Sequence, residues 1–221
     1  MSSPKPRHVF VTGGTGYLGG ALIPELLARG HRVRALARRG SEGKLPAGCE
    51  AVLGNALDSD SFAREVAPAD TLVHLVGVPH PAPWKADQFR KVDLASVHAS
   101  VAAAREAGIR HFVYLSIAQP APVMKSYVAV RAECEELIRG TGIPATFLRP
   151  WYILGPGHLW PYALVPMYAL FERLPLTRDT ARRLGLVTRR EMINALVRSV
   201  EEPPEDVRVV DVPGIRQRAI R

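Results

Sequence analysis

The sequence has little cysteine, no long apolar run and no cluster of metal ligands. Its 221 residues include only Cys49 and Cys134, which lie far apart and in no metal-ligand spacing. We therefore expect neither a disulfide-built secreted fold nor a metal site, and we expect a reduced, cytoplasmic location. No segment reaches the roughly 18 uninterrupted apolar residues of a membrane span, and the first residues lack the apolar core of a secretory signal. A membrane partner is not expected.

Acidic residues are fewer than basic ones, which gives a net charge of +8 and a pI of about 9.9. Such a surplus attracts nucleic acid or a small anionic ligand. The basic residues are scattered, however, and no aromatic residues alternate with a basic cluster, so we expect no nucleic-acid partner. The length and the hydrophobic content of 47% suit one compact α/β domain with a sizeable core.

A glycine cluster near the N-terminus is the most informative segment. The apolar run Val9–Val11 precedes it and a helix-like apolar run follows it. A strand, a tight glycine turn and a helix place a pyrophosphate against the N-terminus of that helix. Gly13 or Gly14 permits the sharp turn, Gly16 lets backbone N–H groups approach phosphate, and Gly19 lets the helix pack closely on the strand. Both usual glycine spacings fit, so the cluster predicts a dinucleotide site.

Strands and helices alternate along the first 150 residues. We expect strands at Val9–Val11, Arg32–Ala37, Glu50–Gly54, Asp70–Val76, Arg110–Ser116 and Ala145–Arg149. Further helices are expected at Ser59–Val66, Lys85–Ala107 and Lys125–Arg139. This alternation implies right-handed crossovers, and hence the α/β class with a doubly wound parallel sheet of the Rossmann type.

The character of the sequence changes after Pro150, because prolines and aromatic residues crowd Trp151–Pro166. The regular elements expected beyond this point are helices at Tyr162–Phe171 and Arg189–Val200 and a strand at Val207–Val212. We assign residues 1–150 to a dinucleotide-binding Rossmann domain. Residues 151–221 are expected to form a small C-terminal substrate cap, not an independent domain, over the carboxyl ends of the strands, where such sheets bind ligands.

Cofactor choice is indicated at the end of the second expected strand. Sites for NAD place a carboxylate there for the ribose 2′-OH, whereas sites for NADP place arginine there for the 2′-phosphate. The run Arg32–Ala37 contains no acid, and Arg38 and Arg39 follow it. A guanidinium makes a charge-assisted contact to phosphate. We therefore expect NADP in preference to NAD.

Several motifs then occur in the order found in a known superfamily. The sequence resembles the extended and atypical branches of the short-chain dehydrogenases/reductases, which include the NAD-dependent epimerase/dehydratase-like and NmrA-like proteins. Thr12–Gly19 resembles the phosphate loop of that family, and His74–Gly77 resembles the end of its fourth strand beside the cofactor. Val113–Ser116 resembles the strand that carries the active-site serine, and Leu148–Pro150 the segment that brackets the nicotinamide.

The resemblance implies which residues bind the cofactor. In Gly54–Asp58 the family has an acidic residue that contacts adenine, and Asn55 stands at that position. Together with the two arginines, the implied cofactor-binding residues are Gly13, Thr15, Gly16, Tyr17, Leu18, Gly19, Arg38, Arg39, Asn55, Ala56, Leu75, Val76, Gly77 and Pro150.

The resemblance also implies three catalytic residues. Tyr127 and Arg131 match the Tyr-x-x-x-Lys core of the family, with arginine in place of lysine, and Ser116 precedes them. In the family the tyrosine is the general acid/base, the lysine lowers its pKa and the serine polarises the substrate carbonyl. Arginine is longer and planar, so it does not fit a lysine site without rearrangement. Two interpretations stay open: a working Ser116–Tyr127–Arg131 set, or an ordinary helix tyrosine beside a surface arginine.

Other polar and aromatic residues carry weaker signals. His74 lies in an apolar strand and is expected to be a packed residue, whereas His80 and His158 lie on loops near the mouth of the site. The aromatic residues expected near that mouth, as a pocket lining or as the core of the cap, are Trp84, Trp151, Tyr152 and Trp160.

We therefore expect an NADP(H)-dependent oxidoreductase that acts on a small carbonyl, alcohol or quinone. A non-enzymatic NADP(H) sensor or scaffold is the alternative, because the family lysine is missing. A sugar-nucleotide epimerase or dehydratase is less favoured, since residues 151–221 are few for a nucleoside-diphosphate sugar site. In many relatives the helices corresponding to Lys85–Ala107 and Lys125–Arg139 pair between subunits, so a homodimer is a further expectation.

Overall fold

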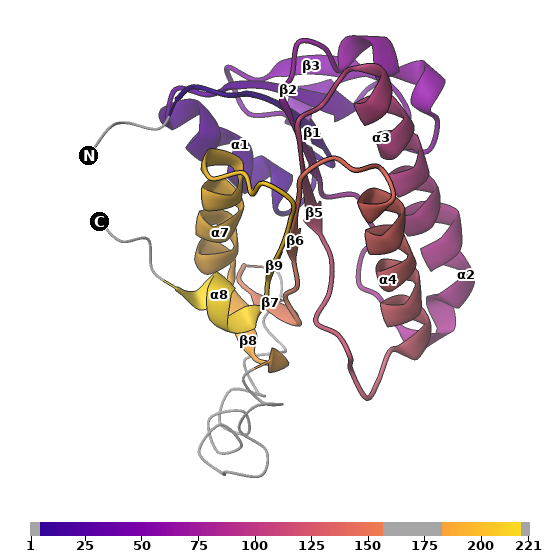
Figure 1. The fold of residues 1–221 in the computed structure, drawn as a ribbon. Helices are drawn as coiled ribbons and strands as arrows, with labels where there is room; N and C mark the ends of the chain where they lie inside the picture. The colour runs from indigo at the N-terminus through magenta and orange to yellow at the C-terminus, as the bar shows by residue number, and fades with distance from the viewer. Residues whose placement is uncertain (1–4, 157–182, 218–221) are drawn as a thin grey trace.

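A seven-stranded parallel sheet lies between two layers of helices in the computed structural model of the chain (Figure 1), which describes residues 5–156 and 183–217. The strands are β1 (His8–Thr12), β2 (Arg32–Ala37), β3 (Glu50–Leu53), β4 (Thr71–His74), β5 (His111–Leu115), β6 (Ala145–Leu148) and β9 (Val207–Val210). Their order is β3-β2-β1-β4-β5-β6-β9, and every pairing is parallel. The predicted doubly wound α/β fold is confirmed.

The strand order reverses next to β1, and this positions the site. In register, Val9 of β1 lies opposite Val33 of β2 on one side and opposite Thr71 of β4 on the other. The chain leaves β1 and β4 in opposite lateral directions, so a crevice opens at the carboxyl ends of these two strands. The glycine loop that follows β1 therefore lies beside Leu75, which follows β4.

Helices cover both faces of the sheet (Figure 1). One layer holds α1 (Gly19–Ala28), α7 (Arg189–Glu201) and α8 (Val212–Arg216); the other holds α2 (Ala86–Gln88), the π-helical η5 (Phe89–Leu94), α3 (Ala95–Glu106) and α4 (Lys125–Arg139). Alternate side chains of each strand point to opposite faces. Phe10 and Leu72 accordingly belong to the core under α3 and α4, whereas Val11 and Val73 belong to the core under α1 and α7.

Two predicted helices differ from expectation. The segment Ser59–Val66 forms two short 3₁₀ turns, η2 (Ser59–Ser61) and η3 (Ala63–Glu65), instead of one α-helix. Phe62 interrupts them with φ −149° because its buried ring turns into the core. The predicted helix at Lys85–Ala107 is helical over α2, η5 and α3, but η5 widens it to π geometry. Two other short turns are η1 (Glu42–Lys44) and η4 (Pro83–Lys85).

The C-terminal segment contributes to the sheet itself. Thr188 begins α7 with a capping box, in which its side chain accepts from the Glu191 N–H and Glu191 accepts from the Thr188 N–H. The predicted helix at Arg189–Val200 is confirmed as α7. The predicted strand at Val207–Val212 forms over Val207–Val210 as β9, and Val212 already belongs to α8. A second, two-stranded sheet of β7 (Tyr152–Leu154) and β8 (Leu186–Thr188) was not predicted. The expected helix Tyr162–Phe171 lies outside the described residues, so the cap over residues 151–221 stays a prediction.

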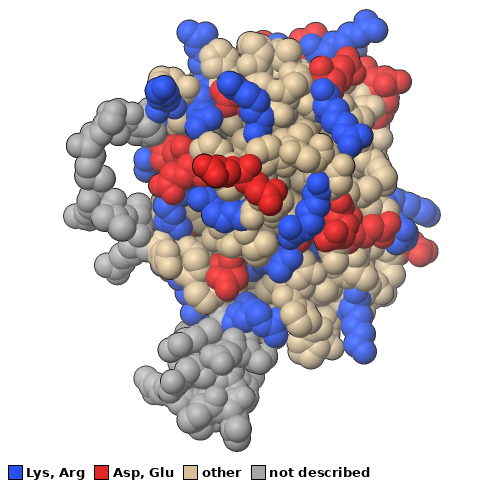
Figure 2. All heavy atoms as spheres, in the orientation of Figure 1, with Lys and Arg blue, Asp and Glu red and all other residues tan. Residues whose placement is uncertain are grey.

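Charged side chains of both signs are interspersed on the surface. On the face drawn in Figure 2, Lys and Arg alternate with Asp and Glu and do not gather into one basic stripe. Several of the arginines are paired: Arg34 contacts both Glu50 and Glu65, and Arg90 contacts Glu133. Within residues 5–156 and 183–217, no helix is long and apolar enough to cross a membrane. In the same part of the chain, no three His, Cys, Asp or Glu side chains form a group that could hold a metal ion.

Candidate active site

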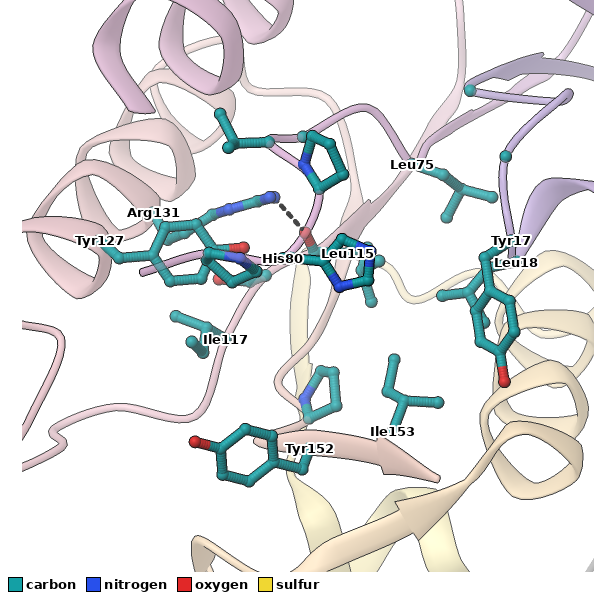
Figure 3. A pocket seen from close by; sticks show the side chains of 18 of the residues that line it. Tyr17, Leu18, Leu75, His80, Leu115, Ile117, Tyr127, Arg131, Tyr152 and Ile153 are labelled. Atoms are coloured by element: carbon teal, nitrogen blue, oxygen red, sulfur yellow. Dashed lines mark hydrogen bonds between the residues drawn. The ribbon is translucent and has the colours of Figure 1, made fainter. Parts of the chain in front are cut away.

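A pocket of about 510 Å³ opens at the carboxyl ends of the strands. Its walls come from the segments that follow β1, β4, β5 and β6 and from the first turns of α4. Of the predicted site residues, it is lined by Gly13, Gly16, Tyr17, Leu18, Gly19, Leu75, Gly77, Ser116, Tyr127, Arg131 and Pro150. Figure 3 shows Tyr127 and Arg131 on one side of the pocket and Tyr17 and Leu18 on the other. The fold therefore brings the glycine loop and the predicted catalytic pair into one pocket.

The glycine loop is closed so tightly that side chains would not fit at most of its glycines. Gly13 has φ +80°, and a Cβ there would lie 2.9 Å from the carbonyl carbon of Leu75. A Cβ at Gly19 would lie 2.3 Å from the Gly13 carbonyl oxygen. Gly16 is exposed to the pocket, and a Cβ there would lie 3.2 Å from the same oxygen. These close approaches bring the first turn of α1, which no described side chain caps, to the pocket wall. A backbone cradle at an uncapped helix N-terminus fits a pyrophosphate.

Four predicted cofactor residues lie beyond the pocket lining, at the edge formed by β2 and β3. These strands pair with Ala37 opposite Leu53, and the Gly54 N–H donates to the Ala37 carbonyl. Arg38 and Arg39, which follow β2, and Asn55 and Ala56, which follow β3, therefore share the carboxyl edge of the sheet. Both arginines are exposed, and the Asn55 side chain accepts from the Leu57 N–H.

Thr15 and Val76 do not line the pocket. Both are half-buried and adjoin residues that do. Pro150 is buried in its wall, where its carbonyl accepts from the Ala118 N–H. The binding roles of these residues, like those of the other predicted cofactor residues, stay predictions.

Tyr127 lies on the first turn of α4 and is 8% exposed. Its ring packs against Phe89 with 4.7 Å between centroids, and the Arg131 guanidinium carbon lies 5.1 Å from its centroid. Burial raises the pKa of the Tyr127 phenol above its ordinary value; the charge of Arg131 opposes this rise and the Asp93 carboxylate adds to it. Tyr127 is therefore a phenol at neutral pH, the form that donates a proton.

Arg131 is not a surface residue, because its side chain is 5% exposed and lies between three elements. One guanidinium nitrogen, Nη1, donates to the Leu115 carbonyl at 2.7 Å (Figure 3) and to the Tyr114 hydroxyl at 3.2 Å. The other, Nη2, lies against Gly77, where a Cβ would be 2.3 Å away. A glycine at the end of the His74–Gly77 motif therefore makes room for the longer arginine side chain.

Asp93 is the partner of Arg131, and the sequence did not single it out. Its fully buried carboxylate oxygen Oδ1 lies 2.5 Å from Arg131 Nη2, and Oδ2 accepts from the Val78 N–H at 3.1 Å. Burial raises the pKa of Asp93, and the charge of Arg131 opposes that rise. A signal was available: Phe89, Asp93 and Val97 are spaced by four along one helix face, and the other two are buried apolar residues. A carboxylate on such a face needs a buried partner.

Ser116 lines the pocket, but its hydroxyl is hydrogen-bonded to a buried carboxylate behind the pocket wall. It donates to Glu135 Oε1 at 2.6 Å, and Arg149 makes a bidentate pair with the same buried carboxylate at 2.9 and 2.5 Å. Gln119 is a further donor to Glu135. With its hydrogen given to Glu135, Ser116 has none left to donate to a substrate carbonyl in this arrangement. Its predicted role in orienting the carbonyl stays a prediction.

His74 and His80 lie where the sequence predicted, the first packed in the core and the second on a loop that lines the pocket. His74 is buried and packed: its Nδ1 lies 2.9 Å from both the Thr12 and the Ser100 hydroxyls, and desolvation lowers its pKa to about 3. His80 lines the pocket with φ +49°, and Lys85 donates to its carbonyl. His158 lies outside the described residues.

Among the aromatic residues expected near the mouth, Trp151 and Tyr152 line the pocket and pack edge to face with 5.5 Å between centroids. Trp84 does not line it and is 84% exposed. Trp160 lies outside the described residues.

Comparisons with known proteins agree with this geometry. A family model described as NAD(P)H-binding matches residues 13–159. Ceramide reductase of Caulobacter vibrioides is 29% identical over 184 residues, which cover 82% of this chain and 57% of the relative. A farnesyl-dihydroquinoline-oxide ketoreductase of Stigmatella aurantiaca is 29% identical over 170 residues, or 67% of this chain and 51% of the relative. The chain thus spans little more than half the length of these relatives.

Solved structures share the fold at low identity. MoeE5 in complex with UDP-glucose and NAD superimposes with a TM-score of 0.69 at 20% identity, covering 94% of this chain and 79% of that one. The UDP-glucose 4-epimerase of Thermus thermophilus in complex with NAD gives a TM-score of 0.69 at 18% identity, covering 92% and 77%.

Proposed function

Because this chain belongs to the NAD(P)H-binding family, we propose that it is an NADP(H)-dependent reductase of the extended short-chain dehydrogenase/reductase type, which acts on a small, apolar carbonyl compound or quinone. The observation that carries the proposal is the position of Tyr127. A buried phenol and a paired arginine lie in the same pocket as the glycine loop.

The proposed roles follow from the contacts. The glycine loop and the first turn of α1 would hold the pyrophosphate, and Arg38 and Arg39 would hold a 2′-phosphate at the edge of the sheet. When bound, the cofactor would supply the hydride that is added to the carbonyl carbon. Tyr127 would donate its phenolic proton to the carbonyl oxygen, which favours the reductive direction because the phenol is the form present at neutral pH.

The substrate class is inferred from the apolar side chains that line the pocket together with Tyr127. They include Ile117, Met124, Trp151 and Ile153. Such a lining suits an apolar body with a single polar reacting group. The name of one relative compared above, a farnesyl-bearing dihydroquinoline-oxide ketoreductase, likewise describes a carbonyl substrate with a large apolar group.

The test is NADPH consumption against a panel of quinones, aldehydes and ketones. Tyr127→Phe should lower kcat by about 10²–10⁴-fold, the usual contribution of a positioned acid. Tyr152→Phe is the matched control, because Tyr152 lines the same pocket away from Arg131. Turnover that survives Tyr127→Phe would remove this residue from the mechanism.

A non-enzymatic NADP(H) sensor is the second candidate, and two contacts favour it. The charge of Arg131 is paired with Asp93, and the Ser116 hydroxyl donates its hydrogen bond to Glu135. A sensor would bind NADPH tightly, consume none with any compound of the panel, and keep its affinity in Tyr127→Phe.

A further inference from the structure

The space beside Tyr127 is occupied by a buried ion pair instead of a single free cation. Asp93 Oδ1 and Arg131 Nη2 lie 2.5 Å apart, and both side chains are almost fully removed from solvent. A charge buried in this way interacts strongly with its neighbours, because little water screens it. The ring of Tyr127 lies against the guanidinium, so Tyr127 experiences both charges of the pair.

Asp93 also ties the guanidinium to the pocket wall. Its second oxygen accepts from the Val78 N–H, and Val78 lines the pocket next to Gly77, against which Arg131 packs. The carboxylate is carried by the π-helical η5, a geometry that is rare and that often occurs at functional sites. The position of Arg131 is therefore fixed by η5, by the Leu115 carbonyl and by the close approach to Gly77.

We propose that Asp93 is a positioning and charge-balancing residue: it holds Arg131 against the ring of Tyr127 and offsets its charge, so that Tyr127 stays a phenol and the site donates a proton. This inference rests on the proposed reductase function, and it explains why the site would reduce a carbonyl instead of oxidising an alcohol. An unbalanced cation at the same place would instead favour the phenolate, which is a base and would serve the oxidation of an alcohol.

Among the described residues, the other titratable groups near Tyr127 carry less charge close to its hydroxyl than the Asp93–Arg131 pair does. They are Cys134 on the same helix, Tyr114 of β5 and His80 of the loop that follows β4. Burial raises the pKa of Cys134 to about 11 and raises that of Tyr114 as well, so both are uncharged at neutral pH. His80 is exposed to solvent, which screens it.

The experiment is a pH titration of the full chain labelled with ¹³Cζ-tyrosine, followed by NMR, with Tyr127→Phe used to assign the resonance. In Asp93→Asn the pKa of Tyr127 should fall by about 1 or more, since an opposite charge close by shifts a pKa by roughly 1–3. In Asp93→Asn/Arg131→Met both charges are gone, and the pKa should not fall below that of the wild type. A folded Asp93→Asn protein with an unchanged Tyr127 pKa would overturn the proposal.

Folding of the two variants is informative too. Asp93→Asn leaves a buried arginine without its carboxylate, and removing one partner of such a pair is strongly destabilising. If Asp93→Asn unfolds while the double variant folds, Asp93 is required because of Arg131, as proposed. If both unfold, Asp93 supports the fold by another route and the proposal is wrong. The titration needs no turnover, so an inactive wild type would count against the proposed function alone.

Discussion

The glycine-loop end of the pocket (Gly13–Gly19) and its Tyr127 end (Tyr127, Arg131, Asp93 and Ser116) are held by different kinds of interaction. At the first, backbone packs on backbone: a Cβ at Gly13 or Gly19 would collide with main-chain atoms. At the second, buried charges hold side chains in place, through Arg131–Asp93 and Arg149–Glu135. One pocket therefore combines a rigid local scaffold with a long-range polar one, and the two are open to separate tests.

Gly16→Val should have the largest effect on cofactor binding and should act on the glycine-loop end alone. Its branched side chain would enter the space expected for the pyrophosphate, and the loss of that contact should weaken NADPH binding by roughly a hundredfold or more. Calorimetric titration measures this. Gly20→Ala is the matched control, because a Cβ at Gly20 meets nothing within 4 Å. Wild-type affinity in Gly16→Val would show that the glycine loop does not bind phosphate.

The double variant Arg38→Ala/Arg39→Ala tests the same end of the pocket, because it should weaken the binding of NADP but not that of NAD. Charge-assisted contacts to a 2′-phosphate contribute roughly 1.5–3 kcal/mol, so NADP affinity should fall about tenfold to a hundredfold, with NAD affinity nearly unchanged. Arg32→Ala is the control, since Arg32 is an exposed arginine at the opposite end of β2. Equal losses for both cofactors would indicate a general structural role.

The pH dependence tests the Tyr127 end without any substitution. Because burial raises the pKa of Tyr127, the phenol persists through neutral pH, so the rate of carbonyl reduction should be nearly flat between about pH 6 and pH 9. The reverse oxidation needs the phenolate, and its rate should rise by roughly tenfold per pH unit over the same range. Initial rates in both directions measure this. An oxidation rate that levels off near neutral pH would contradict a raised pKa.

Ser116→Ala should have the smallest effect on rate. Its hydroxyl donates to Glu135, so we expect kcat to fall by less than about tenfold, with a loss of stability of roughly 1–3 kcal/mol because a buried carboxylate loses a donor. Urea unfolding and steady-state kinetics measure the two effects, with Ser126→Ala at the exposed start of α4 as the control. A kcat lowered a hundredfold at unchanged stability would restore the role of orienting the carbonyl.

The two ends also differ in what the sequence could predict. The glycine loop is a local pattern, so its strand, turn and helix could be predicted from neighbouring residues. Tyr127 and Arg131 share a helix face at a spacing of four, and their proximity could be predicted in the same way. The α/β alternation likewise predicted the six strands β1 to β6 of the large sheet. A strand was also expected at Val207–Val212, but as part of the cap, whereas β9 pairs with β6 in the large sheet.

The ion-pair partners at the Tyr127 end of the pocket could not be predicted, because they lie on other elements. Asp93 and Glu135 meet Arg131 and Arg149 only after η5, α4 and β6 have packed together. The sequence does show that each carboxylate sits on an apolar helix face, which calls for a buried cation, but it does not show which one. The π geometry of η5 and the pairing of β7 with β8 arise from tertiary packing in the same way.

Deuterium transfer tests the central claim, that both ends of the pocket act on one substrate, most directly. The full chain would be incubated with NADPH deuterated at the transferred C4 position and with the best acceptor of the panel, and the product analysed by mass spectrometry. We predict that every product molecule from the wild type carries one deuterium and that Tyr127→Phe forms the same deuterated product about 10²–10⁴-fold more slowly, with equal NADPH affinity in both. Tight NADPH binding without deuterated product from any acceptor would contradict the account and leave a cofactor-binding sensor.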